Sequence, residues 1–221
     1  MTPTNPRALV IAKAPVAGRV KTRLGADVGM VYAAELAAAA LLDSLDACAG
    51  AFGPESCWLS LAGDLADAVR ADELAAAVRR WTVVPQRGRG FGERLVNAHL
   101  DAGAEEGAVV QIGMDTPQVT AAGLTAVADG LGEHDAVLGD APDGGWWVLG
   151  LRRPAAAAAL RGVPMSTPTT GADTRAALEG AGLAVGRTTE LTDVDTAADA
   201  HLVAALAPGG RFAAAWRGRP R

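Results

Sequence analysis

The segment from Arg7 to Leu24 constrains the fold of this chain of 221 residues more than any other stretch. It opens with the short apolar run Arg7–Ala12, in which Leu, Val and Ile follow one another directly. An uninterrupted run of this kind is typical of a strand that is buried on both faces of a parallel sheet. We therefore expect it to form a buried strand of an open α/β sheet.

A cationic loop follows this strand. Open α/β sheets usually bind their ligands beyond the carboxyl ends of the strands, so the position favours a site for an anion. Arginine offers a planar fork to phosphate oxygens and lysine a mobile point charge. By itself, the loop is equally consistent with a solvated basic surface. It begins at Ala14 and Pro15, turns at Gly18 and carries the cations Lys13, Arg19, Lys21 and Arg23, which we expect to be exposed.

The loop matches neither of the two common phosphate-binding motifs. A P-loop requires Gly directly before its Lys-Ser/Thr pair, whereas Val20 stands at that position. A dinucleotide fingerprint requires its glycines in this turn, and only Gly18 and Gly25 are present. A second Gly-rich, cationic loop, QRGRGFGER, follows an apolar run at Trp81–Pro85, but its G-x-G-x-G spacing is weak evidence on its own. The predicted phosphate site thus depends on position and charge rather than on a motif.

Short apolar runs alternate with helical patterns along most of the chain. Such alternation indicates a mainly parallel sheet with helices on both faces. The run Trp146–Leu151 suits a flanking antiparallel strand, and residues 208–221 are predicted to form a basic tail. Strands are predicted at 7–12, 56–62, 81–85, 108–113 and 135–139, and helices at 30–49, 65–80, 92–102, 120–131, 172–181 and 196–207.

Composition narrows the class of protein. The formal net charge of −5 argues against general nucleic-acid binding, so the clustered cations are better explained by a local anion. Cys48 and Cys57 fit no metal motif or disulfide framework, and the histidines are too scattered to form a ligand cluster. We expect no signal peptide, and no apolar run approaches the roughly 20 residues of a membrane span. We expect a single cytoplasmic domain without nucleic-acid or membrane partners, and its oligomeric state stays open.

Asp115 is the strongest single candidate for a functional carboxylate. It follows the predicted strand 108–113 directly, and Pro117 prevents that strand from continuing. A carboxylate beside a cationic phosphate loop makes chemical sense when a divalent ion links the two, since Mg²⁺ commonly takes one or two carboxylates together with substrate phosphates. The alternative is that Asp115 forms a turn or caps the helix that follows.

A pair of aspartates, Asp193 and Asp195, stands before the last predicted helix. Two residues that are separated by one position in an extended segment point to the same side, so both carboxylates can reach one ion. We expect this pair to meet Asp115 within about 4–6 Å, close enough to share a divalent cation. The alternative is that Asp195 or Thr196 caps the helix, with Asp199 in its first turn.

The tripeptide Asp143-Gly144-Gly145 is the third candidate. Glycines allow a ligand to approach the backbone closely, and Asp143 can orient an acceptor hydroxyl or act as a general base. A plain hairpin turn explains the tripeptide equally well. The neighbouring Trp146 and Trp147 point to opposite faces of a strand, so either one can be core or a platform for the acceptor.

The motifs taken together resemble a bacterial family of GT-A-type, nucleotide-diphospho-sugar transferase-like proteins over nearly the whole chain. Some members of that family are arsenosugar-biosynthesis-type glycosyltransferases. The same fold occurs in molybdenum-cofactor and deazaflavin-cofactor nucleotidyltransferases. The motifs that carry the resemblance are, in chain order, AKAPVAGRVKTRL, GERL, GMDTP, PDGGWWVLGL, MSTPTTGADT and LTDVDTAAD.

The resemblance implies one three-layer GT-A domain, in which about residues 7–115 bind the nucleotide and about 116–207 the acceptor. It assigns Lys21 and Arg23 to phosphates. One feature departs from GT-A glycosyltransferases, which usually carry D-x-D directly after the central strand. This chain has a single aspartate there and its D-x-D near the end, as nucleotidyltransferases do. The implied ligands of Mg²⁺ or Mn²⁺ are Asp115, Asp193 and Asp195.

These observations lead us to expect a metal-dependent glycosyltransferase that uses a nucleotide-diphospho-sugar and a small-molecule acceptor. The alternatives are nucleotidyl transfer from a nucleoside triphosphate with release of pyrophosphate, and a nucleotide-binding regulatory protein without turnover. Lys21, Asp115 and Asp143 are the predicted catalytic residues. The predicted nucleotide-binding residues are Ala12, Lys13, Ala14, Pro15, Gly18, Arg19, Lys21, Arg23, Gln86, Gly88, Gly92, Gly113 and Met114, and the predicted acceptor-binding residues are Asp143, Gly144, Gly145, Trp146, Thr167 and Thr170.

Overall fold

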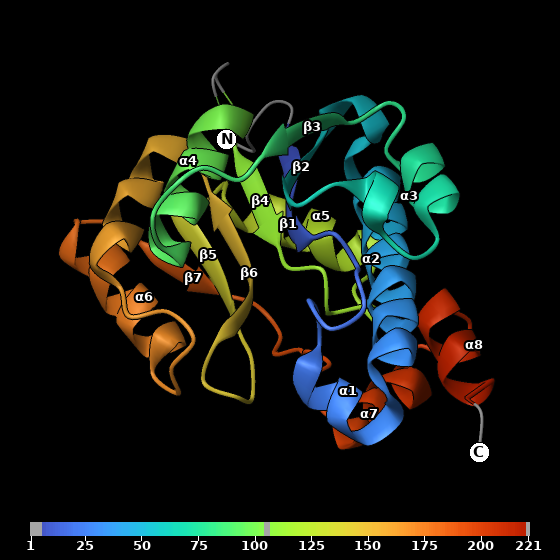
Figure 1. Cartoon of the computed structure of the whole chain (residues 1–221). Helices are drawn as coiled ribbons and strands as arrows, with labels where there is room; N and C mark the ends of the chain where they lie inside the picture. Colours follow the sequence, from blue (N-terminus) through green and yellow to red (C-terminus); the bar gives the residue numbers. More distant parts are fainter. Residues whose placement is uncertain (1–5, 104–106, 220–221) are drawn as a thin grey trace.

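The computed structural model describes residues 6–103 and 107–219, whose strands form one sheet in the order β3-β2-β1-β4-β6-β5-β7 (Figure 1). Strand β6 is antiparallel to both of its neighbours, and all the other pairs are parallel. The strands are β1 (Arg7–Lys13), β2 (Cys57–Ala62), β3 (Thr82–Pro85), β4 (Val109–Ile112), β5 (Ala136–Asp140), β6 (Trp146–Leu151) and β7 (Val185–Arg187). The predicted α/β class with one antiparallel strand is confirmed, but the predicted flanking position is wrong, because β6 lies inside the sheet between β4 and β5.

Helices cover both faces of the sheet (Figure 1). Among the described residues, no helix combines the length and the apolar character needed to cross a bilayer. The α-helices are α1 (Thr22–Val28), α2 (Met30–Phe52), α3 (Ala71–Ala77), α4 (Phe91–Ala102), α5 (Ala121–Gly130), α6 (Thr170–Gly180), α7 (Ala197–Leu206) and α8 (Arg211–Arg217), and 3₁₀ segments span Pro54–Ser56, Leu65–Asp67 and Pro154–Gly162.

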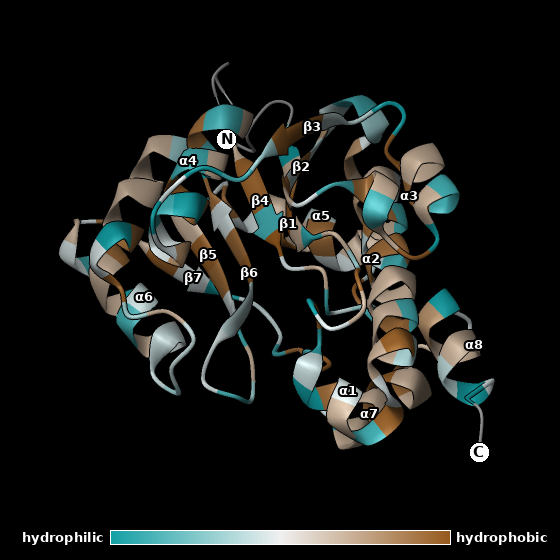
Figure 2. Cartoon of the chain, viewed as in Figure 1, coloured by the Kyte–Doolittle hydropathy of each residue, from teal (hydrophilic) through white to brown (hydrophobic). Residues whose placement is uncertain are grey.

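Strand β1 lies in the middle of the core because its side chains alternate between two apolar layers. Ala8 and Val10 pack with α2, α3 and α5 on one face. Leu9 and Ile11 pack with α4, the 3₁₀ segment Pro154–Gly162 and α6 on the other. Figure 2 shows the central strands coloured as hydrophobic, with hydrophilic residues on the outer helices. The apolar run near the start of the sequence therefore forms a strand that is buried on both faces, as predicted.

The long helix α2 packs closely because much of its buried surface is alanine. Its buried residues face two neighbours. Ala34, Ala38 and Leu41 pack on the sheet, whereas Ala33 and Leu36 pack on a third cluster formed with α1, α7 and α8. Burial on two sides explains why the helix is apolar around most of its circumference.

Two helices differ from the prediction because single residues adopt positive φ. A short helix, α1, begins directly after Lys21 (φ 45°) and is separated from α2 by Gly29 (φ 88°), so the predicted loop is shorter than expected. The predicted helix 65–80 is interrupted at Arg70 (φ 58°), which leaves a 3₁₀ segment and the short α3. Left-handed backbone ends a helical segment, and a non-glycine residue in that conformation gives little sequence signal.

The segment 208–221, predicted to be a basic tail, contains the helix α8 in its described part. Phe212 and Trp216 are buried in the cluster formed with α1, α2 and α7. The two carboxylate oxygens of Asp43 accept hydrogen bonds from the backbone N–H groups of Arg211 and Phe212. The charged residues at both ends of this segment led to the prediction of a basic tail, although the segment contains a helix with an apolar face.

Replacing Phe212 by Ala should destabilise the protein by about 3–5 kcal/mol, because the side chain is 2% exposed and its removal leaves a cavity. Urea unfolding followed by circular dichroism measures the change. The control is Leu206→Ala, whose side chain is 61% exposed and whose loss should alter the free energy of unfolding by less than about 0.5 kcal/mol. Equal stability of the two variants would show that α8 is not part of the core.

Candidate functional site

A cavity of about 760 Å³ lies beyond the carboxyl ends of β1, β4 and β5, where β6 begins. This is the edge at which the ligands of parallel α/β sheets usually bind. Its size is within the range of pockets that hold a nucleotide-sized ligand. The wall includes the cationic loop after β1, Asp115 after β4 and the two late aspartates. The sequence features that suggested phosphate and metal therefore face one space.

Asp115 is positioned by the turn that follows β4. A Cβ atom on Gly113 would lie 2.8 Å from the Asp115 Oδ1, so glycine leaves the carboxylate room at this position. The backbone carbonyl of Asp115 accepts a hydrogen bond of 3.0 Å from the backbone N–H of Val194. Gln118 Nε2 donates a second hydrogen bond, of 2.6 Å, to the carbonyl of Thr192. These two bonds attach the segment that carries the late aspartates to the turn after β4.

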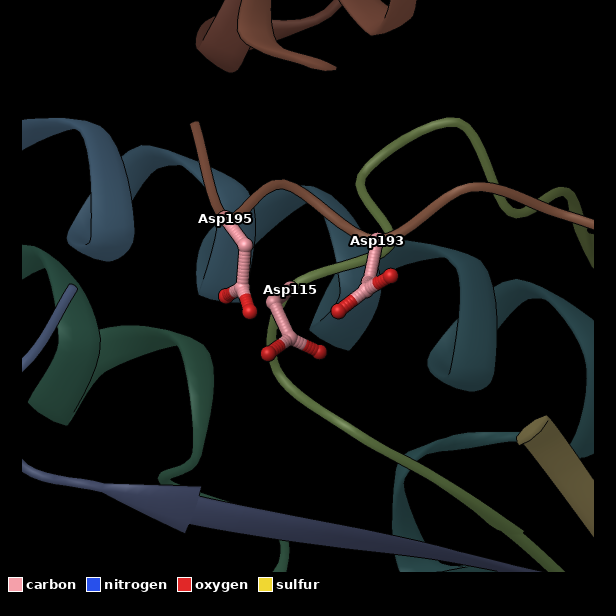
Figure 3. Close-up of side chains that lie close together, drawn as sticks. All are labelled: Asp115, Asp193 and Asp195. Carbon is pink, nitrogen blue, oxygen red and sulfur yellow. The ribbon is translucent and has the colours of Figure 1, made fainter. Parts of the chain in front are cut away.

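The alternation of an extended segment places both late carboxylates at the site. Val194 is 2% exposed and packs into the cluster of α1, α2, α7 and α8. Asp193 and Asp195 flank it and point to the opposite side. Figure 3 shows their side chains converging with Asp115 on a common space, although Asp115 is far from this pair in the sequence.

The structure confirms the alternative in which Thr196 caps the last helix with Asp199 in its first turn, whereas Asp115 and Asp195 cap neither α5 nor α7. Thr196 caps α7, since its hydroxyl accepts from the N–H of Asp199 while the Asp199 carboxylate accepts from the N–H of Thr196. Thr120 caps α5 by accepting from the N–H of Gly123. Neither Asp115 nor Asp195 is therefore needed as a cap.

One carboxylate oxygen from each of Asp115, Asp193 and Asp195 lies within 4.8 Å of the others. The predicted approach of these residues is confirmed. Carboxylate oxygens are the ligands that Mg²⁺ and Mn²⁺ prefer, and the donor set therefore fits a hard divalent ion.

Lys21 makes the central contact of the site. Its Nζ donates to Asp115 Oδ2 at 2.8 Å and to Asp195 Oδ1 at 2.7 Å, and its side chain is 10% exposed. Arg23 Nη1 lies 3.3 Å from Asp195 Oδ2, and its side chain is 79% exposed. The expectation that the loop cations are exposed is wrong for Lys21, because the carboxylates of Asp115 and Asp195 pair with its ammonium in the cavity wall.

The charges of the cluster perturb one another. Burial alone would lower the pKa of the Lys21 ammonium, but Asp115 and Asp195 outweigh it and hold the pKa above its usual range. Burial raises the pKa of Asp193 to about 6 from its ordinary 3.8, with smaller contributions from the neighbouring carboxylates of Asp115, Asp143 and Asp195. Asp193 is thus the carboxylate for which the cluster supplies too little positive charge.

The Asp143 turn forms the opposite part of the wall. The Asp143 carboxylate accepts from the N–H of Gly145 at 2.8 Å, and it is close enough to Asp193 to raise the pKa of that residue. Gly144 has φ 88°, and a Cβ there would lie 1.9 Å from the carbonyl of Pro168, so this turn must contain glycine. The turn is both a hairpin and a part of the cavity, and the two interpretations are compatible.

The two tryptophans divide between core and cavity. Trp147 is 4% exposed, and its indole N–H donates to the Thr189 carbonyl at 2.8 Å. Trp146 is half-buried, and its indole N–H donates to Thr174 Oγ1 at 3.1 Å. Both side chains line the cavity, but Trp146 is the more exposed of the two, so it stays the better candidate for an acceptor platform.

Most of the predicted binding residues line the cavity. On the nucleotide side these are Ala12, Lys13, Arg19, Lys21, Arg23, Gln86, Gly113 and Met114, and on the acceptor side Asp143, Gly145, Trp146, Thr167 and Thr170. Gln86 is fixed there because its Nε2 donates to the carbonyls of Ala12 and Ser60, at 3.0 and 3.1 Å.

Some of the predicted residues lie outside this wall in the described structure, and their roles in binding stay predictions. Ala14 lines a smaller neighbouring pocket, and Gly18 sits at an exposed turn. Gly88 and Gly92 instead allow close packing, because a Cβ at either would lie 2.8 Å from its neighbour. Pro15 and Gly144 are the other two residues of this group.

Several cavity residues were missed by the sequence analysis. Gln111 had a detectable signal, since it is a polar residue within an apolar strand. Its Oε1 lies 2.9 Å from His99 Nε2, and burial lowers the pKa of His99 to about 4. The others lie in the segments QRGRGFGER, GMDTP and MSTPTTGADT noted above, but they were not singled out because they become neighbours only in the folded chain, and they include Phe91, Thr116, Met165 and Ser166.

Asp193→Asn should stabilise the metal-free protein at pH 7.5 and have less effect as the pH falls towards 4.5. The folded-state pKa of Asp193, about 6, is above the ordinary 3.8, so ionisation opposes folding above about pH 6 and protonation relieves this at lower pH. The shift corresponds to at most about 3 kcal/mol, which solvent screening reduces to roughly 1 kcal/mol. Thermal unfolding in EDTA across this pH range measures the effect, and a pH-independent change would contradict it.

Comparison with known proteins agrees with the fold. The chain is similar to a protein of Desulfovibrio desulfuricans G20, provisionally called a nucleotide-diphospho-sugar transferase, with 25% identity, a TM-score of 0.85, and coverage of 97% of this chain and 95% of that one. This likeness confirms the predicted nucleotide-diphospho-sugar transferase-like fold.

More distant structures share the fold. A cytidylyltransferase of Leptospira borgpetersenii has 11% identity and a TM-score of 0.60, with coverage of 97% of this chain and 93% of that chain. A Mycobacterium tuberculosis H37Rv protein in complex with manganese has 20% identity and a TM-score of 0.55, with coverage of 90% and 98%.

No curated protein sequence matches the chain. A family profile described as "Uncharacterized protein conserved in bacteria (DUF2064)" matches residues 44–167, which include Asp115 and Asp143 and make up more than half of the sequence. The chain therefore belongs to the DUF2064 family.

Proposed function

We propose that this protein is a metal-dependent glycosyltransferase that moves a sugar from a nucleotide-diphospho-sugar to a small-molecule acceptor. One observation carries the proposal. Lys21 and the carboxylates of Asp115, Asp193 and Asp195 meet in a cavity at the carboxyl ends of parallel strands. A site that combines cations with several carboxylates suits a diphosphate and a divalent ion together.

Asp115, Asp193 and Asp195 would hold Mg²⁺ or Mn²⁺. When bound, the ion supplies positive charge that stabilises the diphosphate as the bond to the sugar breaks. The manganese complex of the M. tuberculosis protein supports the choice of a divalent ion for this fold. The half-buried Asp193, with its raised pKa, also fits this role, since an additional cation would favour its ionised form.

The cations of the loop after β1 would bind the phosphates. Lys21 is at the carboxylates, and Arg19 and Arg23 line the same wall. Asp143 faces the cavity from the opposite side and would accept the proton of the acceptor hydroxyl as its oxygen bonds to the sugar and the nucleoside diphosphate leaves. Trp146, Thr167 and Thr170 would form the acceptor side of the wall. In this arrangement residues 7–115 supply most of the nucleotide contacts and residues 116–207 most of the acceptor contacts.

Nucleotidyl transfer is the second candidate, and a specific observation favours it. The carboxylates of the cluster come from two separate segments, Asp115 after β4 and the late pair before α7, rather than from one D-x-D after the central strand. The likeness in fold to the L. borgpetersenii cytidylyltransferase is in keeping with this alternative. Here a nucleoside triphosphate would react with a small phosphate, and pyrophosphate would leave.

The products formed with Mg²⁺ should identify the reaction. A glycosyltransferase should slowly hydrolyse a nucleotide sugar to nucleoside diphosphate and free sugar, because water can replace the missing acceptor. Chromatography of a panel of nucleotide sugars, with and without EDTA, detects this product. The matched control is Asp143→Asn, which should bind the donor normally but hydrolyse it more slowly, by about 100-fold or more if Asp143 is a general base.

Release of pyrophosphate from a nucleoside triphosphate, in the presence of a small phosphorylated acceptor, would overturn the first proposal in favour of nucleotidyl transfer. Binding of nucleotides without conversion of either class of donor would instead indicate a regulatory protein. The same panel therefore separates the three interpretations.

Asp115→Asn should abolish the gain in nucleotide affinity that Mg²⁺ provides. The neutral amide keeps the shape of the side chain but removes one charged ligand, and charge-assisted bonds are worth roughly 1.5–3 kcal/mol each. Calorimetric titration of a nucleoside diphosphate, with and without Mg²⁺, measures the change. Thr120→Ser, which keeps the cap of α5 near the same turn, should behave like the wild type. Full Mg²⁺ dependence in Asp115→Asn would exclude Asp115 as a metal ligand.

A further inference from the structure

Lys21 occupies a position that conflicts with simple metal binding. Its ammonium contacts Asp115 Oδ2 at 2.8 Å and Asp195 Oδ1 at 2.7 Å. These two residues, with Asp193, are the members of the carboxylate cluster proposed above to hold the divalent ion. The same carboxylates would therefore serve both a lysine and a metal ion.

The contact is built into the local backbone. Lys21 is in the left-handed region (φ 45°, ψ 46°) immediately before α1, and its side chain is 10% exposed. Of the three carboxylates in the cluster, the neighbouring Arg23 pairs with that of Asp195, and its side chain is 79% exposed, so its charge is largely screened by solvent. Among the described cations, Lys21 is the one that bridges two carboxylates of the cluster.

We propose that Lys21 is an internal counter-ion that makes the site bind its divalent ion together with a phosphate and only weakly alone. This inference rests on the proposed function, because it concerns the same metal and phosphate site. In this proposal, Lys21 makes the protein accept its substrate as a complex of the metal ion and the phosphate.

The physical argument is one of charge and reach. A divalent cation that enters beside the Lys21 ammonium meets like charge at short range and must compete for oxygens that are already paired. A phosphate group supplies negative charge and new acceptors for the ammonium. The lysine stem is long and flexible, so Nζ can move from the carboxylates to the phosphate without a change in the backbone. The carboxylates then become available to the metal ion.

The test is calorimetric titration of Mn²⁺, confirmed by the electron paramagnetic resonance of free Mn²⁺, with and without inorganic pyrophosphate as the phosphate probe. The wild type should bind Mn²⁺ weakly alone and at least tenfold more tightly with pyrophosphate. Lys21→Met should bind Mn²⁺ alone at least tenfold more tightly than the wild type, and it should bind pyrophosphate more weakly. One substitution thus changes the two affinities in opposite directions.

Two control variants isolate the charge and its position. Lys21→Arg keeps the positive charge and should retain weak binding of Mn²⁺ alone. Arg79→Met removes an exposed cation outside the cavity wall and should leave the Mn²⁺ affinity unchanged. If Lys21→Met does not fold, Lys21→Asn is the second neutral variant, because Asn tolerates left-handed backbone.

Mn²⁺ affinity in a folded neutral variant that equals or falls below that of the wild type would overturn the proposal. So would a wild type that binds Mn²⁺ equally well with and without pyrophosphate. Failure of the proposed function is distinguishable from these outcomes. If Lys21→Met gains Mn²⁺ affinity and the wild type gains it with pyrophosphate, but no nucleotide or nucleotide sugar binds, the counter-ion role stands and the transferase proposal does not.

Discussion

The hydrogen bond from the backbone N–H of Val194 to the carbonyl of Asp115 is the contact on which the arrangement of the site depends. It attaches a late extended segment to the turn after the central strand β4. The burial of Val194 among α1, α2, α7 and α8 holds this segment against the helices. Because side chains alternate in an extended segment, burying Val194 turns both of its aspartate neighbours towards Asp115. The burial of one apolar residue, Val194, thus determines the positions of two carboxylates. The same cluster holds α8, so this helix supports the site although none of its residues lines the cavity.

The placement of several carboxylates together has an electrostatic cost that the protein offsets with a lysine. Lys21 pairs directly with Asp115 and Asp195, and burial raises the pKa of Asp193, for which the described residues provide no ion pair, to about 6. The residual negative charge faces a cavity rather than the core. A cluster of this kind gains from an additional cation, and it lies beside a loop whose exposed cations Lys13, Arg19 and Arg23 line the same cavity. The unbalanced negative charge therefore faces a cavity in which a ligand can neutralise it, as is common at functional sites.

The part of the chain that the family profile matches does not contain the whole candidate site. The DUF2064 profile covers residues 44–167, whereas Lys21 and the late aspartates lie before and after it. The matched region contains β2 to β6 and the Asp115 and Asp143 turns. The unmatched ends supply the lysine and the aspartate pair and pack against each other through α1, α7 and α8. The charge balance of the cavity is thus completed by parts of the chain outside the profile.

The sequence by itself determined the α/β class, the buried first strand and the identity of the main candidate residues. Alternating strand and helix patterns are local, and charged residues that follow buried strands are visible without a structure. It did not determine that Lys21 is buried, that α1 and α8 are helices, or that Thr196 rather than Asp195 caps α7. The left-handed backbone of Lys21 left no residue signature, and the pairing of its ammonium requires two segments that are remote in sequence. Tertiary structure decided these points, because burial and ion pairing depend on which neighbours folding brings together, and a linear pattern does not contain them.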